Sequence, residues 1–207
     1  MGELKRAISR DASVVSMALD ATDIVREIES IHKTSAVVSA ALGRLTIAAS
    51  MMGYTLKGEN DTVSIRMDGN GPAGMLIAVA DSRGNVKSYV QNPVVEIPLN
   101  SIGKLDVRGV VGAEGTLSVV KDLGLKEPYS GTVPIVSGEI GEDIANYYAS
   151  SEQVPTVCGL GVLVNPDLTI ANAGGFLVQL LPFADDSCID VIEKNISSIP
   201  PVTTMLK

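Results

Sequence analysis

The chain has 207 residues, of which 45% are hydrophobic, enough for one sizeable domain that buries about 70% of its unfolded surface. Its formal net charge of -8 argues against a nucleic-acid partner, because binding to a phosphate backbone requires clustered Lys and Arg. Aromatic residues make up only 3% of the chain, which argues against a stacking surface for bases or sugars. The first ten residues are polar and charged, unlike a signal peptide, and two cysteines are too few for a disulfide framework. We therefore expect a cytoplasmic protein.

Helices are predicted in the first quarter of the chain. Thr22 and Asp23 can cap a short helix that begins there. The stretch 34–52 that follows is apolar, rich in Ala and Ser, and about as long as a membrane span. Arg44 lies at its centre, where insertion into a membrane would cost about 2.5–3.5 kcal/mol. The sequence therefore predicts a helix buried on nearly all sides inside the protein, and no membrane partner.

From residue 61 onward the hydrophobic pattern has a period of two, which is typical of strands. Apolar and polar residues alternate through 63–68. The runs 75–80 and 86–91 are separated by a turn sequence and predict a hairpin. The runs 116–121 and 131–136 predict further strands. These segments indicate a mainly antiparallel sheet.

The next part of the chain is predicted to form a helix and a last hairpin. The helix covers 139–153 and carries Glu142 and Asp143 in its first turns, where acidic side chains interact favourably with the helix dipole. The hairpin joins strands at 157–164 and 169–181. Strands interrupted by helices without regular βαβ alternation predict an α+β fold, with antiparallel sheets packed around the buried central helix.

The last predicted helix, at about 185–198, has an apolar stripe and is stopped by two prolines. We divide the chain into an α+β domain at 1–182 and the start of a helical linker at 183–207. The stripe can dock on the parent domain, or it can become exposed and bind other chains, since a large apolar patch marks an interaction site. The sequence leaves both interpretations open. The candidate residues for client binding or linker docking are Ile189, Ile192, Ile196, Ile199, Met205 and Leu206.

One glycine-rich segment resembles a dinucleotide-binding fingerprint. Residues 69–74 match GxGxxG, but the segment that follows them is predicted to be a strand. The fingerprint requires a helix there, because its phosphate meets the free N–H groups of a helix N-terminus. Pro72 also removes a donor from the loop. The segment therefore predicts a tight turn.

The cysteines offer the one candidate for catalytic chemistry. A Cys158 nucleophile would need a base, and the chain has a single histidine, His32. Cys158 lies in a predicted strand, where a free cysteine behaves as a small buried hydrophobic residue, and Cys188 is interpreted as a packing residue too. Two separate cysteines cannot supply a four-ligand zinc site. We therefore expect no catalytic residue and no metal ligand in this chain.

Several short motifs occur in a specific order along the chain. GTLSVVKDLGL at 115–125 and SSEQVP at 150–155 are the most informative, and further matches lie at 39–44, 89–93 and 159–164. With these motifs the whole chain resembles the heat-shock protein 33 family. Members of that family are holdases: chaperones that bind unfolding proteins without nucleotide and are activated by oxidation.

The resemblance implies the family's α+β domain followed by the first part of a helical linker. It also implies binding of unfolded or misfolding client proteins under oxidative and heat stress, and a homodimer as the active form. The family's zinc-binding and disulfide-forming cysteines would lie in a domain that begins after Lys207, so this chain itself is expected to have no cofactor. Cys158 and Cys188 do not match that cysteine pattern. We therefore expect residues 1–207 to bind client proteins under all redox conditions.

Two other function classes stay open at this point. One is a small-molecule enzyme with Cys158 as its nucleophile, and the other is a purely structural module that forms dimers. Thiol labelling tests the enzyme, since a catalytic cysteine is exposed and has a lowered pKa. Client binding separates a chaperone from a structural module.

Overall fold

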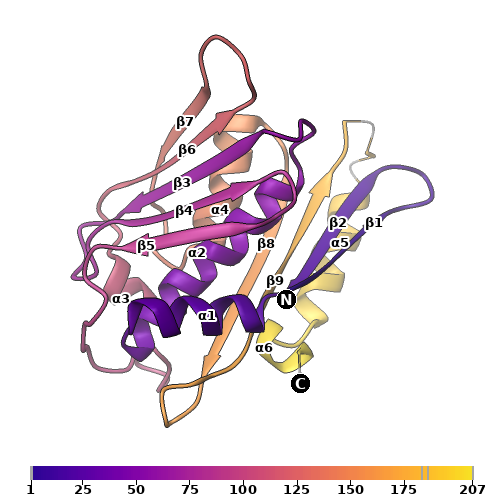
Figure 1. The fold of residues 1–207 in the computed structure, drawn as a ribbon. Helices are drawn as coiled ribbons and strands as arrows, with labels where there is room; N and C mark the ends of the chain where they lie inside the picture. The colour runs from indigo at the N-terminus through magenta and orange to yellow at the C-terminus, as the bar shows by residue number, and fades with distance from the viewer. Residues whose placement is uncertain (1, 183, 186, 207) are drawn as a thin grey trace.

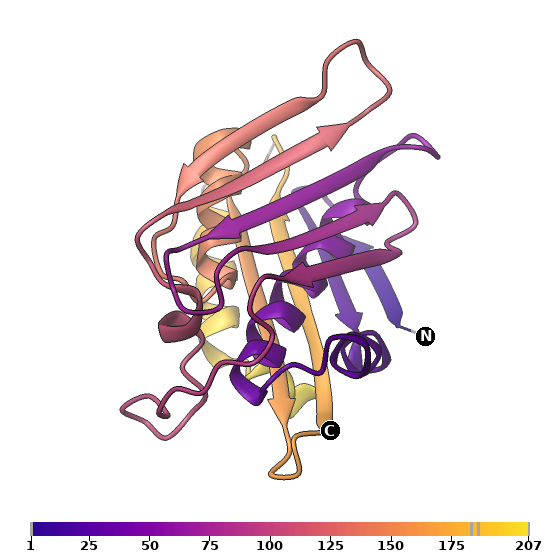
Figure 2. The same ribbon diagram turned by 60° about the vertical axis from the view of Figure 1, so that its left-hand side comes forward.

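The computed structural model describes residues 2–182, 184, 185 and 187–206; Met1, Phe183, Asp186 and Lys207 lie outside it. The described residues form two antiparallel sheets with one long helix between them, as Figures 1 and 2 show. This arrangement confirms the predicted α+β fold with antiparallel sheets around a central helix.

The first sheet is built from strands near the beginning and near the end of the domain's sequence. Its strand order is β1 (Glu3–Ile8), β2 (Val14–Asp20), β9 (Ile170–Leu180) and β8 (Thr156–Val164), and every neighbouring pair is antiparallel. The β8–β9 hairpin confirms the prediction from the sequence. The β1–β2 hairpin was not predicted, because β1 is exposed along almost its whole length and has no clear alternation.

The second sheet is built from the middle of the chain. Its order is β5 (Val86–Val90), β4 (Leu76–Asp81), β3 (Thr62–Asp68), β6 (Thr116–Asp122) and β7 (Tyr129–Pro134). These strands confirm the period of two in the sequence. Alternate residues of β3, β4 and β6 are buried against the helix, and the opposite face of the sheet lies toward solvent.

The long helix α2 (Ala36–Tyr54) forms the centre of the core. It packs against strands of both sheets, and 16 of its 19 residues are buried. Its length and composition would allow it to span a membrane, but 89% of its most apolar window is buried inside the protein. The prediction of a core helix is confirmed. Arg44 reaches out of this core to the carboxylate of Glu139, with 2.6 Å between its Nη1 and Oε2.

Two glycines of α2 allow strands to approach its backbone closely. A Cβ on Gly53 would overlap the carbonyl oxygen of Asp81 and lie 2.8 Å from the Cβ of Ala80 in β4. A Cβ on Gly43 would meet side-chain atoms of Val162 in β8 and of Val25, each at 2.9 Å. The small residues of α2 therefore set the distance between the helix and both sheets.

The shorter helix α1 (Thr22–His32) precedes α2, and its start differs from the prediction. Ala21 is the residue before the first turn, and no side chain caps the helix. The Thr22 hydroxyl instead donates to the Asp20 carboxylate at 2.7 Å and accepts the Ala173 N–H at 3.1 Å. Thr22 thus ties the helix to β9, a long-range role that local capping rules do not reveal.

A buried carboxylate organises the next helix, α4 (Gly141–Tyr147), which continues into the π-helical turn η1 (Tyr148–Glu152). Asp143 is fully buried and accepts the N–H groups of Val136, Ser137 and Ile140 at 2.8–2.9 Å. The prediction that Asp143 lies in the first turn is correct. Its complete burial was not predicted, and it connects the end of β7 to the helix. A further short helix, α3 (Val107–Val111), packs against α2.

The chain ends in two helices that lie beside the first sheet. They are α5 (Ser187–Ser198) and α6 (Val202–Met205). The predicted helix at 185–198 is thus confirmed from residue 187 onward, with Asp186 outside the described residues. Every residue of α5 is described and none is buried, which distinguishes it from α2. The division of the chain at residues 182 and 183 stays a prediction.

We predict that Gly53→Ala destabilises the protein by roughly 1–3 kcal/mol, the usual cost of overpacking a core. In an exposed helix the same change would be stabilising by about 1 kcal/mol. The sign of the change in unfolding free energy therefore tests the close packing of Gly53. Urea unfolding of the variant measures it. Gly43→Ala is the matched control. Its free energy of unfolding should fall by less, because the new Cβ meets valine methyl groups, which can move. A stabilised Gly53→Ala variant would contradict the close approach of β4.

Candidate functional site

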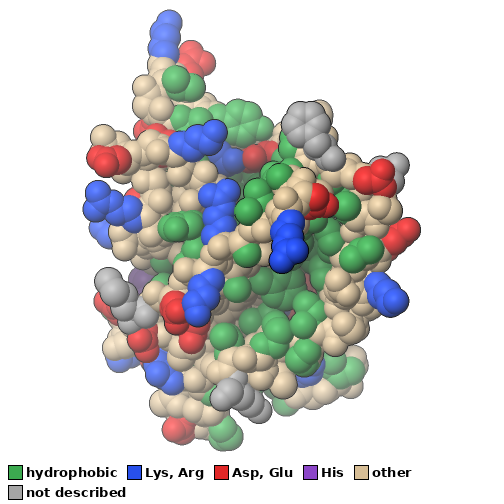
Figure 3. All heavy atoms as spheres, turned by 90° about the vertical axis from the view of Figure 1, so that its right-hand side faces the viewer, with side chains coloured by type: hydrophobic (Ala, Val, Ile, Leu, Met, Phe, Trp, Pro, Cys, Tyr) green, Lys and Arg blue, Asp and Glu red, His purple; other side chains and the backbone are tan. Residues whose placement is uncertain are grey.

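The first sheet has one face on the core and an apolar outer face that points away from α2. On this outer face small residues surround Phe176 of β9, which pairs with Ala18 on one side and Gly159 on the other. Figure 3 shows hydrophobic side chains gathered over a hollowed part of the molecule on this side. We call this face, together with the hollows next to it, the platform.

Hollows remain between the platform and the C-terminal helices. One cavity of about 690 Å³ lies between β1, β2, Phe176 and the side chains of Ile199 and Met205. A second, of about 340 Å³, extends to Leu206. Their walls are mainly apolar, with Lys5 as a charged residue at both rims. The C-terminal helices therefore cover the platform without filling the space beneath them.

The close contacts of α6 with the platform involve glycines. A Cβ on Gly161 of β8 would lie 2.9 Å from Cγ2 of Thr203 and 3.1 Å from Cβ of Val202. A Cβ on Gly174 of β9 would lie 2.7 Å from Cδ1 of Leu206. Strand glycines often mark a close approach of another segment. Here they let a short helix rest directly on the sheet.

The structure separates the predicted candidate residues into two groups. Ile196, Ile199, Met205 and Leu206 line cavities at the platform, whereas Ile189 and Ile192 line none of those described here. Ile189, Ile199 and Met205 are 40%, 39% and 44% exposed, and the other three are half-buried. The C-terminal part of the stripe therefore lines the cavities at the platform, while its first two isoleucines line none of these three cavities, although their exposure is similar.

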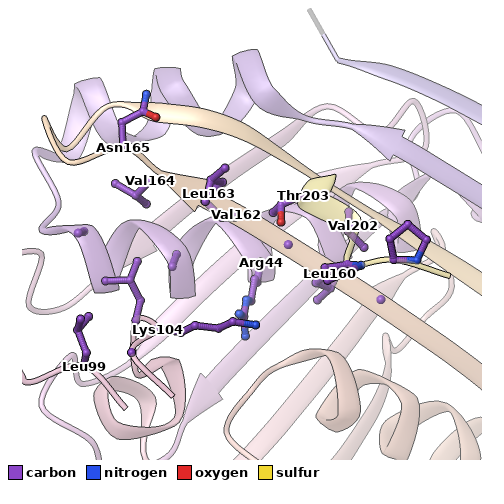
Figure 4. Close-up of a pocket in the computed structure, with 18 of the residues that line it drawn as sticks. Arg44, Leu99, Lys104, Leu160, Val162, Leu163, Val164, Asn165, Val202 and Thr203 are labelled. Carbon is purple, nitrogen blue, oxygen red and sulfur yellow. The ribbon is translucent and has the colours of Figure 1, made fainter. Parts of the chain in front are cut away.

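A third cavity, of about 860 Å³, follows the outer edge of β8. Figure 4 shows Leu160 and Val162 of this strand, with Arg44 and Lys104 on one side and Val202 and Thr203 on the other. The Arg44 guanidinium is held by Glu139, but its Nε is buried and has no hydrogen-bond partner among the described residues. The cavity thus combines apolar walls with two cationic side chains.

The residues proposed for catalysis do not come together. Burial raises the pKa of the Cys158 thiol to about 12, so the thiol stays protonated at neutral pH. The His32 imidazole lies elsewhere, with its Nε2 2.9 Å from the carbonyl oxygen of Ser88. The described residues contain no group of three His, Cys, Asp or Glu side chains that could hold a metal ion. His32 is therefore not placed to act as the base of a Cys158 nucleophile.

The glycine-rich segment at 69–74 forms a loop, as predicted. Gly69 and Gly71 pack against the backbone of Val111 and Gly112, where a Cβ would overlap main-chain atoms. The segment that follows is β4, so no helix N-terminus faces the loop. The loop is a packing feature of the second sheet.

Sequence reasoning missed most residues of the platform. The alternating glycines at 159 and 161 and the pair at 174 and 175 were the available signal, because glycines inside strands indicate close approach of another segment. The contribution of β1 had no such signal. Its exposed residues gain their role only from pairing with β2.

Comparisons with known proteins agree on one family. A family model described as Hsp33 protein matches residues 2–207. A 33 kDa chaperonin of Acetivibrio thermocellus is 52% identical over 201 residues, covering 97% of this chain and 68% of that protein. A 33 kDa chaperonin of Bacillus velezensis is 49% identical over 207 residues, covering 100% of this chain and 71% of that protein.

The fold agrees as well. The crystal structure of a 33 kDa chaperonin, a heat-shock protein 33 homologue from Thermotoga maritima, superimposes with a TM-score of 0.93 at 38% sequence identity. The alignment covers 98% of this chain and 69% of that one.

We predict that Cys158 reacts slowly with a thiol reagent in the native protein at pH 8, because its raised pKa leaves almost no thiolate. Both cysteines are partly exposed, so the raised pKa of Cys158 is the difference tested, and Cys188 on α5 should react much faster. Time-resolved mass spectrometry after alkylation measures both rates, and labelling in denaturant is the control, where the two rates should converge. Fast native labelling of Cys158 would restore the enzyme hypothesis.

Proposed function

The chain belongs to the Hsp33 family of chaperones, and from this premise we propose that it is a nucleotide-independent holdase that binds unfolding proteins at the platform. One observation carries the proposal: an apolar sheet face is covered only by helices that leave hollows beneath them. Client binding follows from the hydrophobic effect, since burial of apolar surface yields roughly 25 cal/mol per Å² without directional requirements. A surface of this kind accepts many sequences.

Access to the platform requires that the C-terminal helices move. α5 and α6 contain no buried residue, and α6 is a single turn of four residues. Segments with few buried apolar contacts open locally at a small fraction of the global unfolding free energy. We infer that a client displaces these helices while the domain beneath stays folded. The acidic net charge of -8 would keep the loaded complex in solution.

The redox part of the proposal concerns what this chain does without zinc. The described residues do not fit a zinc site, because they contain no suitable cluster of ligands, and the raised pKa of Cys158 keeps it protonated as a thiol. We propose that residues 1–207 hold clients under reducing and oxidising conditions alike. We also propose that the protein acts in the cytoplasm as a homodimer, protecting clients during oxidative and heat stress, in line with the resemblance of its sequence.

The test is light scattering of a chemically unfolded test protein, diluted with and without this chain, in reductant and in peroxide. We expect the chain to suppress aggregation in both conditions to the same extent, without nucleotide. An equal mass of an unrelated acidic protein controls for charge and crowding. Failure to suppress aggregation in either condition would contradict the holdase. Suppression in peroxide alone would contradict redox independence.

A second prediction concerns the helical cover. Gly161→Ala places a methyl group 2.9 Å from Thr203 and should push α6 off the platform. We expect higher binding of an apolar dye and stronger suppression of aggregation. The free energy of unfolding should change by less than about 1 kcal/mol, because α6 has no buried residue.

Thr203→Ala supplies the matched control, since it removes the Cγ2 atom that the new methyl group meets. The double variant should return toward the behaviour of the unaltered chain, and Thr203→Ala alone should resemble it. Weaker client binding by Gly161→Ala would show that the docked α6 is part of the client site instead of its cover.

A further inference from the structure

In the described part of the chain, one edge of the first sheet has no neighbouring strand. β8 is the outermost strand, and the carbonyl of Gly159 points toward β9, because it lies 2.8 Å from the position of a Cβ on Gly175. Backbone groups of successive residues point to opposite edges of a strand. The N–H and C=O groups of Leu160 and Val162 therefore point to the free edge.

No hydrogen bond from another described residue satisfies these backbone groups. No loop or turn hydrogen bond among the described residues involves the N–H or C=O of Leu160 or Val162. The carbonyl oxygen of Cys158, two residues earlier, lies against the first residue of α4, 3.1 Å from the position of a Cβ on Gly141. The free part of the edge thus begins after the helix.

The edge also lacks the protection that exposed strand edges normally have. Natural proteins protect such edges with charged residues, prolines, bulges or very short strands. β8 has nine residues, Thr156–Val164, without a charged residue or a proline, and its bulge lies at Leu163 and Val164, at the strand's end. An unprotected edge of this kind is a template for another strand.

The cavity beside β8 provides space for that strand. It follows the edge of β8 and has a volume of about 860 Å³, near the upper end of the roughly 300–1,000 Å³ typical of ligand pockets. Small residues of α2, Ala36 and Ala40, line one side, and Ile196, Ile199 and the residues after them line the other. A strand beside β8 would place alternate side chains against the α2 side, which stays in place when the C-terminal helices move, and the remaining side chains on the side that these helices vacate.

The charges on the α2 side specify one further property of the occupant. Arg44 and Lys104 both line this side of the cavity, as Figure 4 shows. Glu139 pairs with one guanidinium nitrogen of Arg44, while Lys104 forms no ion pair with a described residue. The side therefore retains positive charge, which would attract a carboxylate.

We propose that the free edge of β8 binds an extended client segment as an additional β-strand. The segment has apolar side chains at alternate positions and an acidic side chain facing Arg44 and Lys104. The proposal rests on the proposed holdase function and adds its recognition mode. Main-chain hydrogen bonds are common to all sequences, so strand addition suits a protein that must bind many unfolded chains.

The first experiment uses a fluorescent seven-residue peptide of alternating Val and Thr with one Glu, measured by fluorescence anisotropy. A matched peptide carries N-methyl groups on alternate amides along one edge, which removes hydrogen-bond donors but keeps the side chains. We expect the methylated peptide to bind about tenfold more weakly, from the loss of about two hydrogen bonds. Equal affinities would overturn strand addition and leave apolar contact alone as the binding mode.

The second experiment changes the edge itself. Val162→Pro removes the N–H that faces the free edge and leaves the bonds to β9, while Val162→Ala is the control for the lost side chain. We expect Val162→Pro to bind the peptide about tenfold more weakly than Val162→Ala, with unchanged circular dichroism. Equal binding by the two folded variants would overturn the proposal. If Val162→Pro does not fold, the comparison of the methylated and unmethylated peptides on the unaltered chain decides whether strand addition occurs.

Light scattering with the unaltered chain separates this inference from the holdase function. Suppressed aggregation together with insensitivity to N-methylation and to Val162→Pro would overturn the edge site and leave the holdase intact. Absence of suppression by the unaltered chain would overturn the holdase itself. Lys104→Ala tests the proposed contact with a carboxylate. It should weaken binding of the peptide with Glu but not of the same peptide with Gln. An equal loss of affinity for both peptides would overturn the carboxylate contact.

Discussion

The close packing of α2 between two sheets is the constraint on which the rest of the structure depends. A helix with 16 buried residues must pack closely against strands on several sides at once. Small side chains allow the strands to approach its backbone. Gly43 and Gly53 bring β8 and β4 to the helix backbone. This packing covers one face of the first sheet with the core. The other face is the platform, which meets the C-terminal helices.

The two faces of the first sheet consequently differ in how they are covered. The inner face contributes fully buried residues such as Leu177 to the core. The outer face meets α6 through Gly161 and Gly174 and leaves cavities elsewhere. A rigid platform under a loosely held cover suits a chaperone, because opening exposes apolar surface while the domain stays folded. The free edge of β8 adds main-chain hydrogen-bonding groups to the same region.

The sequence predicted those elements whose local pattern agrees with their final environment. The central helix, the strands of the second sheet and the β8–β9 hairpin all have a clear period, since one side of each is buried. Prediction failed where a contact distant in sequence decides the outcome. Thr22 accepts a hydrogen bond from Ala173 instead of capping α1. The buried carboxylate of Asp143 accepts hydrogen bonds from three backbone N–H groups. The segment β1 is a strand because β2 pairs with it.

By itself the sequence determined the fold class, the family and the apolar stripe of the last helix, because periodicity, motif order and residue type are local properties of a chain. It left open whether that stripe docks or stays exposed. Tertiary structure decided that Ile199, Met205 and Leu206 line cavities at the platform while Ile189 lines none of these cavities. It also decided that β8 has a free edge beside Arg44 and Lys104. Strand order and the distance between a helix and a sheet depend on contacts between remote residues, which no local pattern contains.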